Sequence, residues 1–224
     1  MWKPSGIPTT FGNEACFLDI LMGEKPNPGM DFSIPKFIAP YIDLPDFKPY
    51  VLKDVSIKEQ FRVFGKEKEL GLLNRLDNDT AGFLYFVKTP EIFEKYRQLQ
   101  SEGKVHKWYI AQILGTPKET SFEITMPIMH HRHKADRMIF IRSPKDELKG
   151  RSKMHHPSTI VKVLHTEEKT GISTLLVGIY KGVRHQIRVH LAGIGCSVIG
   201  DSLYGKDDGK GRLCLWSIGF QIQE

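Results

Sequence analysis

The chain has 224 residues, of which 40% are hydrophobic and 26% are charged, so it can bury a core and has the composition of a soluble globular protein. Its 32 lysines and arginines outnumber its 26 aspartates and glutamates, and the net charge of +6 favours a polyanionic partner only weakly. The three cysteines are widely spaced, so they suggest neither a disulfide framework nor a cysteine zinc site, and they fit a reducing, cytoplasmic setting. No apolar run suits a signal peptide or a membrane span, so no membrane association is expected.

The elements expected along the chain begin with an extended, loop-rich segment over residues 1–50, because repeated prolines interrupt any helix there. Within it, residues 17–21 predict one short helix. The apolar run at 83–87 predicts a buried strand. Directly after this strand, Thr89 followed by Pro90 is typical of the start of a helix.

The second half of the chain consists mainly of expected strands joined by turns. These strands cover residues 107–114, 121–125, 138–142, 159–165, 173–179 and 213–218. Helical spacing returns over 184–192, whereas 144–157 is expected to be a flexible loop. Sequential strands with few helices indicate an α+β fold, with a large, mostly antiparallel mixed sheet flanked by helices and loops. We therefore expect a single domain over residues 1–224.

Three segments carry side chains suited to chemistry, and the first is the loop at 73–82. It places Arg75, Asp77 and Asp79 directly before the expected strand, where a rigid loop can hold a carboxylate. A solvated turn with local hydrogen bonds from the aspartates explains the same pattern. Spacing alone favours that simpler interpretation.

The second and third segments combine basic residues with an aromatic ring or with a helix. Lys107 and Tyr109 share one face of an expected strand, so the ring can stack on a base while the amine meets a phosphate. A core tyrosine is the simpler alternative. Arg184 and Arg188 are one turn apart on the expected helix, after Gly182, which suits a phosphate or a buried carboxylate. A solvated basic face is the alternative interpretation of these arginines.

Five motifs occur along the chain in a fixed order. They are Lys3-Pro4-Ser5-Gly6, Asn74 to Gly82, Lys107-Trp108-Tyr109-Ile110-Ala111, Gly182 to Leu191 and Gly200-Asp201-Ser202-Leu203-Tyr204-Gly205. In that order they resemble the K-P-x-G, H-R-L-D-x-x-T-S-G, K-x-Y-x-A, G-R-T-H-Q-I-R-x-H-L and G-D-x-x-Y-G motifs of the RluA-like pseudouridine synthase family. The departures are Asn74 for His, Ala81 for Ser, and Val183-Arg184 for Arg-Thr. One such motif is weak, but five in register make a strong resemblance.

The resemblance implies an enzyme that isomerises uridine in RNA to pseudouridine, with Asp77 as catalytic carboxylate, Tyr109 as stacking ring and Arg188 as partner of that carboxylate. Reactant and product are isomers, so no cofactor and no metal are expected. The carboxylate can serve as a nucleophile or as a base. Further contacts with rRNA or tRNA are expected from Arg75, Lys107, Arg184, His185 and Gln186. The chain is expected to act as a monomer, without an S4-like RNA-binding domain at its N-terminus.

Other interpretations of the residues are weaker. Histidines at 130–133 and 155–156 invite a metal site, yet no ordered carboxylate or cysteine spacing accompanies them. Residues 200–206 mimic a phosphate-binding loop, but Asp207 stands where such a loop needs Ser or Thr for Mg²⁺. A hydrolase that uses Asp77 would need a second acid, which the sequence does not offer. The main alternative is a non-catalytic RNA-binding protein on the same fold.

Overall fold

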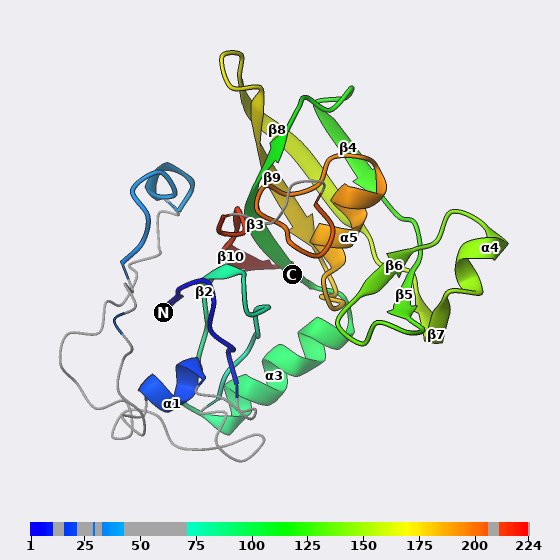
Figure 1. Ribbon diagram of the computed structural model, residues 1–224. Coiled ribbons are helices and arrows are strands. Elements are labelled where there is room, and N and C mark those ends of the chain that lie inside the picture. Colours follow the sequence, from blue (N-terminus) through cyan, green and yellow to red (C-terminus); the bar gives the residue numbers. More distant parts are fainter. Residues whose placement is uncertain (11–15, 22–28, 30–32, 43–70, 206–210, 224) are drawn as a thin grey trace. The chain divides into compact units, whose positions relative to one another are not determined.

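The computed structural model describes residues 1–10, 16–21, 29, 33–42, 71–205 and 211–223 (Figure 1). The chain divides into two compact units, one made of Met1–Glu102 with Trp216–Gly219, the other of Gly103–Leu215 with Phe220–Glu224. We expected a single domain over residues 1–224, and that expectation stays a prediction. The extended segment expected at 1–50 lies only partly within the described residues. In the described ranges, no helix combines the length and the apolar character that crossing a membrane requires.

The first unit contains a small mixed sheet. Strand β1 (Trp2–Lys3) pairs antiparallel with β2 (Ala81–Phe83). Strand β2 also pairs in parallel with β10 (Leu215–Ile222), where Trp216 and Ser217 lie opposite Ala81 and Gly82. The strand expected at 83–87 thus begins two residues earlier and ends sooner, because the regular pairing of β2 ends at Phe83 and Phe86 then forms an isolated bridge to Leu72.

Three helices lie in the described residues of the first unit. They are α1 (Phe17–Leu21), the 3-10 helix η1 (Ala39–Tyr41) and α3 (Pro90–Ser101). The short helix expected at 17–21 is confirmed by α1. The start of α3 is also as expected, since the Thr89 hydroxyl accepts a hydrogen bond from the amide of Ile92. Phe93 and Tyr96 form its buried side.

The second unit contains an antiparallel sheet with the strand order β3-β9-β8-β4. Its strands are β3 (Val105–Leu114), β4 (Ser121–Ile124), β8 (Thr159–Glu167) and β9 (Ile172–Ile179). All four expected strands are confirmed, with ends that differ by no more than two residues. Ile110, Leu175 and Val177 have no exposed surface and form part of its core.

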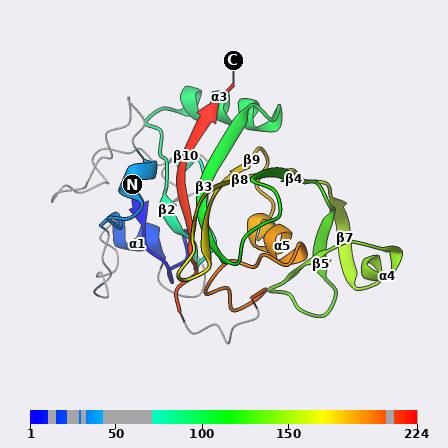
Figure 2. The ribbon, with the colours of Figure 1, turned by 90° about the horizontal axis from the view of Figure 1, so that it is seen from above.

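A second, three-stranded sheet in this unit has the order β6-β5-β7. Its strands are β5 (Ile128–His131), β6 (Met138–Phe140) and β7 (Gly150–His155). The prediction of a flexible loop at 144–157 is wrong. This stretch forms the short helix α4 (Pro144–Glu147) and then β7, which pairs with β5. Helix α5 (Gln186–Gly193) lies between the two sheets of the unit and contacts β6 and β8 (Figures 1 and 2).

Gly82 stands where β2 and β10 approach too closely for a side chain. Its φ is +136°, and a Cβ there would lie 2.4 Å from the backbone nitrogen and oxygen of Ser217. Gly82→Ala should therefore lower the free energy of unfolding by at least about 2 kcal/mol in a denaturant titration. Gly115→Ala is the control, because Gly115 has a φ of +97° but no atom within 4 Å of its Cβ position. Equal losses in both variants would contradict the steric explanation.

Candidate active site

The loop that carries Asp77 is fixed to the strand beside it by Asn74. The Asn74 side-chain amide donates to the Phe83 carbonyl at 3.1 Å, and its oxygen accepts from the Tyr85 amide at 2.9 Å. Asn74 is buried, so these bonds satisfy backbone groups that would otherwise lack partners. The residue that departs from the family's histidine therefore has a structural role in this chain.

Lys3 fixes the same loop from the N-terminal segment. Its ammonium group is fully buried and donates to three carbonyl oxygens, those of Pro4 (2.9 Å), Ile7 (2.8 Å) and Asn78 (3.1 Å). Burial lowers the pKa of Lys3 to about 7, while the carboxylates of Asp79 and Asp77 oppose that shift. Sequence analysis missed this role, because lysine is seldom buried and Lys3 stood out only as part of a motif.

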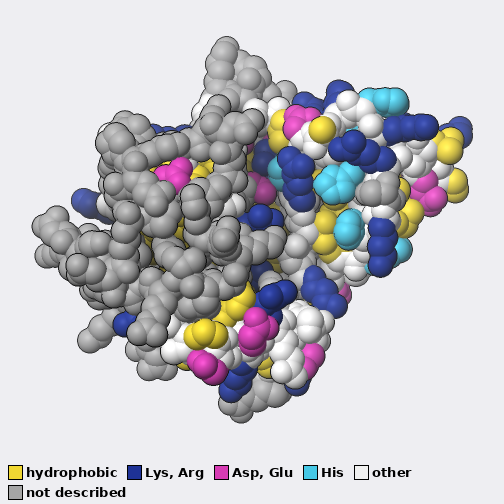
Figure 3. All heavy atoms as spheres, turned by 90° about the horizontal axis from the view of Figure 1, so that it is seen from below, with side chains coloured by type: hydrophobic (Ala, Val, Ile, Leu, Met, Phe, Trp, Pro, Cys, Tyr) yellow, Lys and Arg dark blue, Asp and Glu magenta, His cyan; other side chains and the backbone are white. Residues whose placement is uncertain are grey.

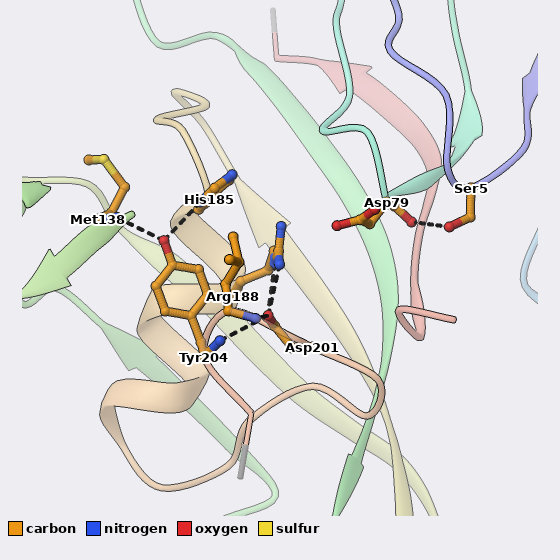
Figure 4. Close-up of polar contacts among 8 residues, drawn as sticks. Ser5, Asp79, Met138, His185, Arg188, Asp201 and Tyr204 are labelled. Atoms are coloured by element: carbon orange, nitrogen blue, oxygen red, sulfur yellow. Dashed lines mark hydrogen bonds and ion pairs between the residues drawn. The ribbon is translucent and has the colours of Figure 1, made fainter. Parts of the chain in front are cut away.

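Further bonds hold the loop along its length. The Ser5 hydroxyl donates to the Asp79 carbonyl at 2.7 Å (Figure 4), and the Thr9 hydroxyl donates to the Leu76 carbonyl at 2.9 Å. Asp77 is half-buried between these points. The loop is thus an anchored support for one carboxylate, which the interpretation as a solvated turn did not anticipate.

The Lys107 and Tyr109 side chains lie on β3 in the second unit. Tyr109 is 7% exposed, whereas Lys107 is half-buried. Burial lowers the pKa of Lys107 to about 8, so its amine remains mostly charged at neutral pH. A Cβ on Gly182 would lie 3.9 Å from the Lys107 amine, which places this amine beside the start of the fourth motif.

Arg184 does not lie on the helix that carries Arg188. His185 precedes the first residue of α5 and has a φ of +53°, a left-handed conformation that separates Arg184 from the helix. The expectation that both arginines share a helical face is therefore wrong. Arg184 is exposed and donates to the Ala135 carbonyl at 3.1 Å.

Arg188 is 2% exposed and forms a two-pronged ion pair with Asp201 (Figure 4). The distances are 2.9 Å from Nε to Oδ2 and 2.7 Å from a terminal nitrogen to Oδ1. Asp201 has no exposed surface, and it also accepts the amides of Leu203 and Tyr204 at 3.0 Å. The solvated basic face is thus wrong for Arg188. Its expected pairing with Asp77 stays a prediction.

The sequence did carry a signal for Asp201. This residue stands in the G-D-x-x-Y-G motif, which was recognised without a partner for its carboxylate. The tyrosine of the same motif takes part in the network, since its hydroxyl accepts from the Met138 amide at 2.8 Å and lies 2.8 Å from Nδ1 of His185. The Tyr204 ring lies 5.5 Å from the guanidinium carbon of Arg188. Asp201 and Tyr204 of the 200–205 motif thus both contact the buried Arg188 of the 182–191 motif.

His185 and Gln186 are both buried, at 8% and 2% exposure. Gln186 donates to the Ser158 carbonyl at 2.8 Å and to the Thr159 hydroxyl at 2.9 Å. Its side-chain oxygen accepts the Val183 amide at 3.1 Å. The polar groups of Gln186 thus stabilise the start of α5, and the RNA contacts expected from His185 and Gln186 stay predictions.

A metal site at the histidines of 130–133 finds no support in the geometry. Within the described ranges, no three His, Cys, Asp or Glu side chains are grouped as metal ligands. Nδ1 of His131 instead accepts the backbone amides of His133 and Lys134, at 3.0 and 3.1 Å. The His131 ring, at the end of β5, therefore holds the turn that follows this strand.

Comparison with known proteins now places the chain in a family. The sequence profile of the family described as RNA pseudouridylate synthase matches residues 1–193. An uncharacterized RNA pseudouridine synthase of Zymomonas mobilis is 29% identical over 71% of this chain and 69% of its own length. The ribosomal large subunit pseudouridine synthase D of Nitrosomonas europaea is 36% identical over 61% of this chain and 36% of its own length. The chain spans less than half the length of several other curated relatives.

The fold agrees with this assignment. Human RNA pseudouridylate synthase domain containing 4 superposes with a TM-score of 0.59 at 17% identity, over 98% of this chain and 78% of that protein. The chain therefore belongs to the RNA pseudouridylate synthase family, and the family resemblance and the α+β fold expected from the sequence are confirmed. Proteins with this name are isomerases that act on RNA.

Removal of the Lys3 amine should destabilise the protein in a pH-dependent way. Lys3→Met leaves three carbonyls without their donor, so we expect a loss of about 2 kcal/mol in the free energy of unfolding near pH 7. The folded pKa of about 7 lies below the ordinary lysine pKa of 10.5, so the unfolded chain binds more protons between these values. Stability of the wild type should thus rise with pH in that window.

Urea unfolding at about pH 6.5 and about pH 9 measures this difference. The advantage of the wild type over Lys3→Met should be larger at the higher pH. Lys162→Met on β8 is the control, because Lys162 is exposed. A constant difference across the two pH values would show that Lys3 is not strongly perturbed by burial.

Arg188 and Asp201 should show strong energetic coupling. Arg188→Met and Asp201→Asn should each cost about 3–5 kcal/mol, because each leaves a buried charge without its partner. The double variant should be more stable than the sum of the two losses predicts. Chemical unfolding of the four proteins measures the coupling, and strictly additive losses would contradict the pair.

The same cycle applies to the pairing expected from the family resemblance. Arg188→Met combined with Asp77→Asn is the test, with Glu168→Gln in place of Asp77→Asn as a control for an exposed carboxylate. Coupling with Asp77 but not with Glu168 would support a shared role for Arg188. Coupling with Asp201 alone would leave Arg188 as a purely structural residue.

Proposed function

We propose that this chain converts uridine to pseudouridine in RNA, with the Asp77 carboxylate as the reacting group. The observation that carries this proposal is the anchoring of the Asp77 loop by Lys3 and Asn74 within a matching family motif. A carboxylate held by fixed backbone on both sides loses little orientational freedom when a substrate binds. A protein that only binds RNA has no need for such a support.

The chemistry needs one ionised carboxylate and no external reagent. The bond between C1′ and N1 breaks, the uracil turns, and C5 bonds to C1′; C5 loses a proton and N1 gains one, so atoms balance. Asp77 either attacks as a nucleophile or removes a proton at C2′, and both routes begin from the carboxylate. The charged amine of Lys3 attracts Asp77, as the opposed shift in the Lys3 pKa indicates.

The proposal gives the remaining site residues roles in holding the RNA. The target base must leave its stack, and Tyr109 would then stack against it while Arg75 fills the gap. Lys107 and Arg184 supply positive charge for phosphates, since the first keeps a mostly charged amine and the second is exposed. The substrate class that we propose is rRNA or tRNA, and the name of one relative, a ribosomal large subunit enzyme, supports rRNA. We also propose that the chain acts as a cytoplasmic monomer.

Asp77→Asn should abolish isomerisation and leave RNA binding largely intact. The amide keeps the shape of the side chain but can act neither as nucleophile nor as base, so turnover should fall by roughly three orders of magnitude or more. Tritium release from RNA that contains 5-tritiated uridine measures turnover, and fluorescence anisotropy measures binding. Unmodified rRNA and tRNA transcripts serve as substrates.

Glu168→Gln makes the same chemical change on an exposed carboxylate and should behave as wild type. A turnover close to wild type in Asp77→Asn would remove Asp77 from the mechanism. If the wild type binds both RNAs but releases no tritium from either, the non-catalytic alternative is correct.

Unchanged turnover of the wild type in excess EDTA is expected as well, since neither route uses a metal.

A further inference from the structure

His185 stands out by its backbone conformation. Its φ is +53°, and among the residues that the structure describes no other residue except glycine has a positive φ. This conformation is unfavourable for a residue with a Cβ, and it persists where the surrounding structure imposes it, often at functional sites. The residue is also only 8% exposed, so the groups around it fix the ring. The backbone before α5 thus holds the imidazole in one position.

The Tyr204 hydroxyl determines which nitrogen of the His185 ring carries the proton. The backbone amide of Met138 can only donate, so the Tyr204 oxygen accepts there, at 2.8 Å. Nδ1 of His185 lies 2.8 Å from the same oxygen, and the hydroxyl proton can be donated to it (Figure 4). A neutral imidazole that accepts at Nδ1 has its proton on Nε2. The far side of the ring is then a donor.

The charges of this network favour the neutral ring. Both oxygens of the Asp201 carboxylate are bonded to Arg188, at 2.9 and 2.7 Å. At Nδ1, His185 thus meets a hydroxyl that can donate, and not a carboxylate that would stabilise an imidazolium. A protonated ring would donate from Nδ1 and would displace the hydroxyl proton from its acceptor. The network therefore selects one neutral form of the ring, with a donor at Nε2.

The segment at 182–185 connects this ring to the side chains proposed to hold the base. Gly182 begins the segment, and a Cβ on it would lie 3.9 Å from the Lys107 amine. Lys107 and Tyr109 are two residues apart on β3, so their side chains share a face of that strand. His185 ends the segment directly before α5. The segment therefore leads from the face of Tyr109 to the helix that carries Arg188.

A fixed neutral donor suits a base better than a phosphate. Exposed cations are the groups best suited to phosphates, and lysine and arginine side chains lie open on the described surface (Figure 3). Arg184, which precedes His185, is exposed as well. The pyrimidine bases differ at C4, where uracil has a carbonyl oxygen and cytosine has an amino group. A group that can only donate binds the carbonyl and is opposed by the amino group.

We propose that His185 is a specificity-determining residue, which donates from Nε2 to the O4 carbonyl of the target uracil, and that Tyr204 is its positioning residue. A ring free to change tautomer could accept from the cytosine amino group as readily as it donates to uracil. The Tyr204 hydroxyl removes that freedom, so a bound cytosine would leave two donors facing each other. The identity of the ligand as the target base rests on the proposed function.

Heteronuclear NMR of the nitrogen-labelled protein tests the tautomer at about pH 8, where an exposed histidine is neutral. Long-range correlations between ring protons and ring nitrogens distinguish a protonated nitrogen from a bare one. His185 should show a bare Nδ1 and a protonated Nε2 in the wild type, and a mixture in Tyr204→Phe. Loss of these signals in His185→Gln assigns them. The exposed His165 on β8 should show a mixture in both proteins and is the internal control.

Fluorescence anisotropy tests base selection, with two labelled RNA hairpins whose loops differ only in one base, a single uridine or a cytidine. The wild type should bind the uridine hairpin roughly tenfold more tightly, because cytidine leaves a buried donor unpaired. Tyr204→Phe should narrow that ratio to roughly threefold or less, mainly through tighter binding of cytidine. His185→Gln should narrow it in the same way while Tyr204 stays in place, since the glutamine amide can turn to donate or to accept.

Matched controls separate the hydroxyl and the ring from general effects on folding. Tyr180→Phe removes a hydroxyl from another half-buried ring of the same unit and should keep the wild-type ratio. His185→Asn is the control for the backbone, because asparagine tolerates a positive φ but its amide is too short to reach the position of Nε2. It should weaken uridine binding, which relief of backbone strain alone would not do. Binding is measured well below the melting temperature of each variant.

A narrowed ratio in Tyr204→Phe and His185→Gln, but not in Tyr180→Phe, supports the proposal. A doubly protonated ring or the opposite tautomer in the wild type would overturn it, as would a wild type without a preference for uridine. Equal weakening of both hairpins in His185→Gln would assign the residue to the RNA backbone and also overturn it. Because NMR and anisotropy need no turnover, a wild type that selects uridine in this way but releases no tritium would keep the inference and refute only the proposed activity.

Discussion

An arginine with 2% exposure must be neutralised inside the protein, and the second unit is arranged around that requirement. Asp201 meets the Arg188 guanidinium with both oxygens and also accepts two backbone amides. Tyr204 then connects this pair to β6, through the Met138 amide, and to the start of α5, through His185. A change at Arg188 would thus affect the helix, the small sheet and the segment at 200–205 together. The fourth and fifth motifs act as one structural element, although 13 residues separate the paired charges.

The constraint in the first unit is different. A short loop must be kept in a fixed position next to a short strand. Asn74 provides the bonds that a longer strand pairing would provide, since it both donates to Phe83 and accepts from Tyr85. Lys3 gathers three carbonyl oxygens around one buried amine. That amine has a perturbed pKa, so the support of the loop is sensitive to pH in a range where a surface lysine would not be. Asn74, which stands where the family motif has histidine, therefore leaves the loop fixed.

Positive charge and the candidate carboxylate belong to different units of the chain. Residues 128–157 of the second unit contain most of the excess charge, whereas Asp77 lies in a loop that also holds Arg75 and Asp79 and is bonded by the buried Lys3. Phosphates of RNA are bound by exposed cations, whereas the proposed chemistry needs one ionised acid held in place.

Local patterns in the sequence determined the elements whose periodicity depends on their own residues. Helix α3 with its Thr89 cap, the strands β3 and β9, and the order of the five motifs were all predictable, because they rest on spacings of two to four residues or on direct motif matches. Only the tertiary structure decided that Asp201 neutralises Arg188, that Asn74 replaces strand pairing, and that 144–157 completes a sheet instead of forming a loop. The left-handed backbone at His185, which removes Arg184 from the helix, is also of this kind. These features depend on which distant groups meet when the chain folds. A buried charge or an unpaired strand edge needs a partner, and the packing of the chain decides which group lies close enough to be that partner.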